Sequence, residues 1–250
     1  MRTFGAVVEW TTFLTMATIL CRSKREGLFQ AYPVFYVYVA YMMLYTLALF
    51  PIYMFLPSLY SKAYWTLEFA TILVSLGVTW EIYRTVLRAY QGVWRLSGKL
   101  IAVLYTLAIA KFAADLSIQG MGRLVPTMAE FERDVRFMQA VLLFVVIVLV
   151  LRYRIPMGRN AACLTCGYAF FISSEVVNLT LRSALGTPFQ RWWEILEPLE
   201  YLAMVGLWCV GFWIKSADPA PSFALERDYA WASHETADAL ARLRGWLGVR

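Results

Sequence analysis

Charged residues and histidine are scarce in this sequence. Only 16% of the 250 residues are charged, and His234 is the single histidine. A soluble domain typically has about a quarter of its residues charged. With 60% hydrophobic residues and a mean hydropathy of +0.57, the composition indicates an integral membrane protein. The aromatic fraction of 16% agrees with this, because Trp and Tyr gather at membrane interfaces.

The near absence of histidine and of known motifs excludes several kinds of chemistry. Haem in a membrane usually needs paired histidines, and zinc or di-iron enzymes need several His or carboxylate ligands. A retinal protein needs a lysine in the middle of its last helix, but Lys215 lies at the end of that segment. There is no phosphate-binding glycine loop, no nucleophile–base pattern, and no Lys/Arg cluster dense enough for nucleic acid. We expect neither haem nor retinal nor another cofactor, and these absences favour a role other than catalysis.

Cysteine is also rare, and its four positions do not suggest a disulfide framework. Cys163 and Cys166 form a C-L-T-C pair that lacks the flanking pattern of a metal or iron–sulfur site. Cys21 and Cys209 lie near the same predicted side of the membrane. We expect all four thiols to stay reduced and to pack as small buried hydrophobic residues.

What the sequence does contain is a series of long apolar segments. About 20 apolar residues are needed to cross the hydrocarbon core as a helix. The sequence therefore predicts an all-α membrane protein, with a bundle of seven transmembrane helices in residues 1–214. The expected spans are Phe4–Cys21, Val34–Leu56, Tyr64–Tyr83, Leu96–Ile118, Phe137–Leu151, Ala161–Ala184 and Pro198–Ile214.

Lys and Arg predict how the bundle is oriented. With the N-terminus outside, the inner loops carry ten Lys and Arg residues and the outer loops carry six. Positive residues concentrate on the cytoplasmic side, so this bias predicts an outside N-terminus and an inside C-terminus in the cell (inner) membrane. The six residues assigned to outer loops are Lys62, Arg123, Arg133, Arg136, Arg182 and Arg191.

A layer of ionisable residues is predicted in the outer third of the membrane. Lys111 and Asp115 lie one turn apart in the fourth span, and Lys111 is roughly 18 Å above Lys99 at 1.5 Å per residue. Carboxylates of other spans fall at a similar depth. The predicted polar cluster comprises Lys111, Asp115, Glu175, Asn178, Glu68, Glu9, Glu200 and Tyr45, with Glu197 beside it.

Two interpretations of this layer remain open. Charges inside a membrane cost about 2.5–3.5 kcal/mol on insertion scales, so they should be paired and face the bundle interior or water. Lys111 is expected to point inward, near Asp115 or a carboxylate from Glu68, Glu175 or Glu9. The pair is then either a structural ion pair or part of a polar pocket open to the outside. Acids outnumber bases, which suits a cationic or proton-coupled ligand, or a carboxylate held by Lys111.

The second span supports a polar interior. Tyr38, Tyr41 and Tyr45 recur at the spacing of one helical face. Their hydroxyl groups need hydrogen-bond partners when they are surrounded by lipid or protein. The face is interpreted either as aromatic packing or as one wall of the pocket.

A weak internal similarity raises the alternative of a carrier. An offset of 132 residues aligns Leu67-Glu68-Phe69 with Leu199-Glu200-Tyr201, so spans one to three match spans five to seven. Such a 3+1+3 parallel repeat is similar in architecture alone to the small seven-helix sugar transporters of the SWEET type. The Pro-Gln loop motif of those proteins is missing, and the first and fifth spans lack proline.

The segment 215–250 differs from the rest of the chain. "SADPAPS" predicts a Pro/Ser hinge, and the residues after it have the period of an amphipathic helix. That helix would lie on the inner leaflet or contact a membrane or cytoplasmic protein partner. Two functions follow. The first is a ligand-binding or sensory membrane module with a partner at its tail, and the alternative is a small-solute or proton-coupled transporter built from two three-helix halves.

Overall fold

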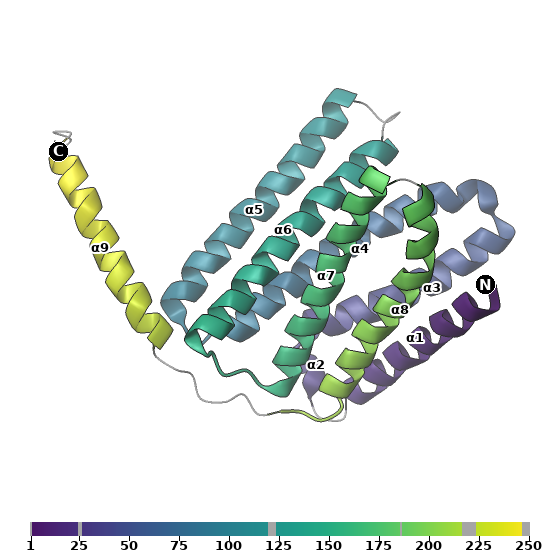
Figure 1. Ribbon diagram of the computed structural model, residues 1–250, viewed down its shortest axis with the longest axis horizontal. Coiled ribbons are helices and arrows are strands. Elements are labelled where there is room, and N and C mark those ends of the chain that lie inside the picture. Colours follow the sequence, from purple (N-terminus) through teal and green to yellow (C-terminus); the bar gives the residue numbers. More distant parts are fainter. Residues whose placement is uncertain (1, 25–26, 120–123, 186, 217–223, 247–250) are drawn as a thin grey trace.

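The computed structural model describes residues 2–24, 27–119, 124–185, 187–216 and 224–246 (Figure 1). In this part of the chain the fold is all-helical, with 92% helix and no strand. The all-α prediction is thus confirmed. The helices are α1 (Arg2–Ser23), α2 (Leu28–Ala31), α3 (Pro33–Phe55), α4 (Pro57–Leu87), α5 (Gln91–Gln119), α6 (Leu124–Tyr153), α7 (Arg159–Leu185), α8 (Thr187–Gly211) and α9 (Ala224–Trp246).

Four of the helices are long and apolar enough to cross a membrane. These are α3, α5, α6 and α7, judged by length and composition over the described residues. They suggest a membrane protein, as the composition predicted. We call the end of the bundle that carries the α4–α5 and α6–α7 connections its inner end, because the predicted orientation places these connections inside the cell.

Helix α4 lies at the centre of the bundle. It packs against α3, α5, α6 and α7, while α1 packs against both α3 and α8 (Figure 1). Helices α5, α6 and α7 slope in the same direction. Within the bundle α5 packs mainly on α4 and α6, and α6 packs on α7. Helix α5 is therefore peripheral. Its side chains Leu96, Leu100, Val103 and Leu107 are exposed on the outside of the bundle, as expected of a surface that faces lipid.

Helix α6 begins at Leu124, well before the predicted span that starts at Phe137. The apolar spacing explains the longer helix, because Met128, Phe131 and Val135 lie on one face and are buried against the bundle. Arg133 and Arg136, which were assigned to an outer loop on sequence grounds, therefore belong to α6. This difference changes which charged residues meet.

Aromatic side chains fill the inner half of the core. Phe35 of α3 stacks on Phe212 with ring centroids 4.5 Å apart, and it meets Trp208 of α8 edge-on at 5.0 Å. Trp208 is fully buried. Helices α7 and α8 approach so closely here that a Cβ atom added at Gly211 would overlap the Cβ of Cys163. Small residues permit such close packing between membrane helices.

The cysteines differ from the sequence expectation. All four are free, but Cys21 and Cys166 are exposed on the outside of the bundle, whereas Cys163 and Cys209 are partly buried. The expectation of buried packing is therefore wrong for Cys21 and Cys166. Their helices turn these small apolar side chains outward, which has little energetic consequence if the surrounding medium is lipid.

The end of α8 is tied to α1 and α7 at the inner end of the bundle. The Arg22 guanidinium donates to the carbonyl oxygen of Trp213 at 2.6 and 3.0 Å. The buried Asn160 amide donates to Gly211 O at 2.8 Å and accepts from the Ser216 N–H at 2.6 Å. These bonds satisfy carbonyl groups that the helix end leaves unpaired, and they fix where the chain leaves the bundle. The predicted Pro/Ser hinge covers residues 216–222, of which only Ser216 lies within the described residues.

Candidate functional site: a buried arginine among glutamates

Lys111 does not point into the bundle. It forms an ion pair with Asp134 of α6, and the two side chains are 59% and 37% exposed. Of the expected partners, Asp115 contributes only a smaller charge attraction than Asp134, and no ion pair joins Lys111 to Glu68, Glu175 or Glu9 in the described residues, so the expectation of an inward-pointing Lys111 is wrong. The reason is the longer α6, because its extra turns place Asp134 beside α5 at the level of Lys111.

The buried cation of this layer is Arg136 of α6. Its side chain is 4% exposed, and its Nη2 lies 3.7 Å from Glu68 Oε1 of α4. Its Nε lies 3.9 Å from Glu132 Oε1, one turn earlier on the same helix. The guanidinium carbon sits 5.8 Å from the centre of the Phe171 ring of α7. Arg136 is thus held between three helices at the outer end of the core.

The guanidinium of Arg136 is incompletely hydrogen-bonded. Both carboxylate distances exceed the roughly 3.2 Å upper limit of an ordinary N–H···O bond. Its Nε and Nη1 atoms are buried and have no hydrogen-bond partner among the described residues. A buried donor without a partner is costly, and a polar gap of this width suits a bridging water or a ligand atom. The Nε and Nη1 atoms of Arg136 can thus donate to a further hydrogen-bond acceptor.

Glutamates of α4, α6 and α7 lie near Arg136, and two glutamates of α8 lie near these glutamates in turn. Glu175 of α7 interacts electrostatically with Arg136, Glu132, Glu197 and Glu200, the last two from α8. Glu68 of α4 interacts with Arg136, Glu132 and Glu197. We call Arg136 and these five glutamates (Glu68, Glu132, Glu175, Glu197 and Glu200) the glutamate cluster. With all five ionised, its formal charge would be strongly negative despite the arginine.

Aromatic side chains border the glutamate cluster. The Tyr45 hydroxyl donates to Glu68 Oε2 at 3.3 Å, and the Tyr41 hydroxyl donates to Leu67 O at 2.5 Å. On the other side, Phe171 meets Tyr201 edge-on, with centroids 5.7 Å apart. The tyrosine face of α3 therefore supplies hydrogen bonds as well as packing.

A row of buried polar groups extends from the glutamate cluster toward the inner end of the bundle. The Gln139 amide, one turn below Arg136, donates to Ser75 Oγ at 3.2 Å and to Thr79 Oγ1 at 3.0 Å. The Tyr168 hydroxyl donates to Ser75 O at 3.0 Å. All of these side chains are fully buried, and Gln139 Oε1 lacks a partner in the described part of the chain. Polar groups thus line the seam between α4, α6 and α7 toward mid-core.

The structure brings together only part of the residue set predicted from sequence. Glu68, Glu175, Glu200 and Tyr45 belong to the cluster or touch it. Asn178 is buried one turn beyond Glu175. Lys111 and Asp115 lie on the peripheral helix α5, and Glu9 is exposed on α1. No group of His, Cys, Asp and Glu in the described residues is arranged to hold a metal ion.

Sequence reasoning missed Arg136, Glu132 and Gln139. A usable signal was present, since the apolar spacing of Met128, Phe131 and Val135 extends the helix through this region. Following that spacing places Arg136 and Gln139 next to the apolar stripe. Arg136 is instead predicted to lie in an outer loop, because the charged residues around it lower the local hydropathy.

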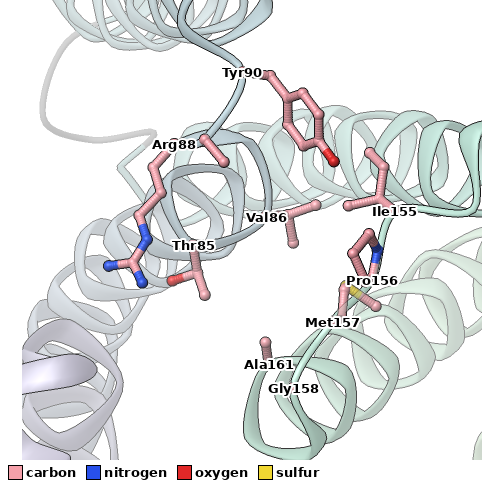
Figure 2. Close-up of a pocket in the computed structure, with 10 residues that line it drawn as sticks. Thr85, Val86, Arg88, Tyr90, Ile155, Pro156, Met157, Gly158 and Ala161 are labelled. Carbon is pink, nitrogen blue, oxygen red and sulfur yellow. The ribbon is translucent and has the colours of Figure 1, made fainter. Parts of the chain in front are cut away.

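A cavity separate from the glutamate cluster lies at the inner end of the bundle. It is a cavity of about 180 Å³ between the end of α4 and the α6–α7 connection (Figure 2). Figure 2 shows Ile155, Pro156 and Met157 on one side of it, with Thr85 and Arg88 on the other. Its lining is mainly apolar and contains no carboxylate, so its chemistry differs from that of the glutamate cluster.

No protein-family model, curated protein or solved structure matches this chain.

Proposed function

We propose that this protein is a seven-helix module of the cell (inner) membrane that binds a small organic cation in its glutamate cluster. The single observation that carries the proposal is the excess of carboxylates near one buried arginine. Ammonium groups donate hydrogen bonds to carboxylates and are attracted to aromatic faces. Both features border the same position.

Seven spans are supported by the lengths of the remaining helices. Helices α1, α4 and α8 have 22, 31 and 25 residues. At 1.5 Å per residue each exceeds the roughly 30 Å of a hydrocarbon core. They pack into the same bundle as the four more apolar helices. Their charged residues Glu68 and Glu200 face inward, which is how charged residues are tolerated in a membrane.

In this proposal Arg136 acts as an internal counter-ion. When the site is empty, it partly neutralises Glu68 and Glu132 at distances of 3.7 and 3.9 Å. An entering ammonium takes over part of that role, and the guanidinium shifts toward Glu175. Such an exchange couples ligand binding to the packing of α6 against α4 and α7. The inner ties from Asn160 and Arg22 to the end of α8 would carry this change toward a partner at the tail.

A carrier is the second candidate, and the row of buried polar groups below the glutamate cluster favours it. Gln139, Ser75, Thr79 and Tyr168 offer hydrogen-bonding groups beneath the cluster. The peripheral α5 also fits the connector of a 3+1+3 repeat, since its main contacts among the described residues are with α4, α6 and α9. A carrier for a small solute, coupled to protons, would use this seam as its path.

The experiment compares three compounds that share a phenyl ring and differ in the polar group attached to it. Thermal unfolding of the purified full-length protein is measured with benzylammonium, benzyl alcohol and benzoate. Stabilisation by benzylammonium alone is expected, and it should be lost in Glu175→Gln. Glu9→Gln, which changes an exposed glutamate outside the cluster, should retain it. Stabilisation by benzoate, or an unchanged response of Glu175→Gln, contradicts the proposal.

A transport measurement distinguishes the ligand-binding module from the carrier. Protein in liposomes is supplied with labelled benzylammonium, with and without an inward proton gradient. Binding without accumulation supports the ligand-binding module. Accumulation that depends on the gradient and is lost in Glu175→Gln supports the carrier.

A further inference from the structure

A row of tyrosines runs from the exposed α3–α4 end of the bundle to the glutamate cluster. The Tyr53 and Tyr60 rings meet edge-on with centroids 5.5 Å apart, and Tyr60 stacks on Tyr64 at 6.2 Å. Tyr53 is 64% exposed, whereas Tyr60 and Tyr64 are half-buried. Glu68, one turn further along α4, is buried. The row therefore joins the molecular surface to a carboxylate of the cluster.

The α4 members of this row belong to a longer polar face of that helix. Six polar residues follow one another at intervals of three or four, which keeps them within an arc of about 100°. They are Tyr60, Tyr64, Glu68, Thr71, Ser75 and Thr79. Ser75 and Thr79 accept the hydrogen bonds of the Gln139 amide below the cluster. The tyrosines are thus the outer part of one face that extends into mid-core.

The tyrosines nearest the cluster come from two helices. The Tyr45 hydroxyl of α3 donates to Glu68 Oε2 at 3.3 Å, and Tyr45 lies near Tyr64 of α4. Tyr64 in turn lies near Glu132 of α6 and Glu197 of α8, as well as near Glu68. Aromatic rings and carboxylates of four helices therefore lie together at the outer side of the glutamate cluster.

Glu68 already faces hydrogen-bond donors of the protein. Its Oε2 accepts from Tyr45, and its Oε1 lies 3.7 Å from Arg136 Nη2. A primary ammonium would compete with these donors, and any of its N–H groups that faced the tyrosine rings would lack an oxygen acceptor. A buried N–H without an acceptor is costly. A quaternary ammonium donates no hydrogen bond and is attracted to aromatic faces. The surroundings of Glu68 therefore suit a methylated ammonium better than a primary one.

We infer that the cation bound by the glutamate cluster is a methylated ammonium compound, with the rings of Tyr45, Tyr60 and Tyr64 against its methyl groups and Glu68 supplying the opposite charge. This inference rests on the proposed function and names the chemical class of its ligand. Tyrosines also gather at membrane interfaces, where they face lipid head groups. Tyr45 and Tyr64 differ from such residues, because they lie next to a buried carboxylate inside the bundle.

The test compares benzyltrimethylammonium with benzylammonium, which have the same ring and charge and differ in three methyl groups. Binding to the purified full-length protein is measured by isothermal titration calorimetry, and benzyltrimethylammonium should bind more tightly. Tyr64→Leu should weaken its binding by about 3- to 30-fold, as expected for the loss of one cation–π contact. Tyr64→Phe keeps the ring and should retain most of the affinity. The control Phe50→Leu, which removes a 59% exposed ring on another face of α3, should leave the affinity unchanged.

Two kinds of result would overturn this inference while leaving the proposed function intact. Tighter binding of benzylammonium would show that hydrogen-bond donation governs recognition. An unchanged affinity in Tyr64→Leu, or an equal loss in Tyr64→Phe, would show that the ring does not hold the ligand. If Tyr64→Leu does not fold, as judged by its melting temperature without ligand, Tyr60→Leu and Tyr60→Phe are compared in the same way. Failure of both cations to bind the wild-type protein would overturn the proposed function and this inference together.

Discussion

The Arg136 guanidinium faces the Glu68 carboxylate across 3.7 Å in the core, close enough for charge attraction but too far for a direct hydrogen bond. The pair joins α6 to α4 where the glutamate cluster begins. The two charges attract each other without a direct hydrogen bond, so either group can still form a hydrogen bond to another partner.

Removing Arg136 alone should be strongly destabilising. Arg136→Met leaves Glu68, Glu132 and Glu175 without their cation, and breaking a buried ion pair costs about 3–5 kcal/mol. Arg136→Met combined with Glu68→Leu should recover part of the loss. The stabilities of these variants are compared by heating each one in detergent and measuring how much of its monodisperse peak is lost. The control is Arg133→Met, because Arg133 is 59% exposed on the same helix. Equal effects of Arg133→Met and Arg136→Met would refute the buried role.

Glu81 should be structurally required at the start of α3. Its carboxylate accepts hydrogen bonds from the backbone N–H groups of Val34 at 3.0 Å and Phe35 at 2.7 Å. Glu81→Leu strands both donors, at about 1–3 kcal/mol for each unsatisfied group. Glu81→Gln keeps one accepting oxygen and should be the milder change. The free energy of unfolding, measured by denaturant titration in mixed micelles, distinguishes them, and a Leu variant as stable as wild type would rule out the capping role.

Two glycines of α8 should respond differently to the same substitution. Gly211→Ala places a methyl group against Cys163 of α7 and forces the helices apart, whereas a Cβ at Gly206 meets nothing within 4 Å. Overpacking typically costs about 1–3 kcal/mol. Gly206→Ala should instead be neutral or stabilising by up to about 1 kcal/mol, since alanine is the better helix former. Melting temperatures of the two variants are compared, and the prediction fails if Gly211→Ala is the more stable.

The Lys111–Asp134 pair should be replaceable as a unit. Both residues are substantially exposed on the outside of the bundle, where a single unpaired charge near lipid costs about 2.5–3.5 kcal/mol on insertion scales. Lys111→Met or Asp134→Leu alone should lower the yield of folded protein, and the double variant should restore it. Asp115→Leu combined with Lys111→Met is the matched control and should give no rescue. Rescue by Asp115→Leu instead would show that Lys111 pairs within its own helix.

The orientation of the bundle can be tested directly. In a background without native cysteines, Ser58→Cys at the start of α4 should react with an impermeant maleimide added to intact cells. Ser233→Cys, which is exposed on α9, should react only after the cells are opened. The basis is the excess of Lys and Arg in the predicted inner loops. The reverse labelling pattern would invert the proposed topology while leaving the glutamate cluster unchanged.

Several properties of this protein follow from the sequence by itself. The low charge, the high hydropathy and the spacing of apolar residues determined the all-helical fold and pointed to a membrane protein. The glutamates Glu68, Glu175 and Glu200 were also recognisable, because a carboxylate within an apolar run must find a polar environment. These are local properties, which a window of about 20 residues already contains.

The tertiary structure alone decided which charges meet. Lys111 has the sequence context of an interior cation, but α5 lies at the edge of the bundle and turns it toward Asp134. Arg136 has the context of a loop, but α6 extends past it and α4 and α7 close around it. The depth of a residue follows from its position along a helix, whereas its burial depends on the rotation of that helix and on its neighbours. Those two quantities arise from packing between segments far apart in the chain, and no single segment encodes them.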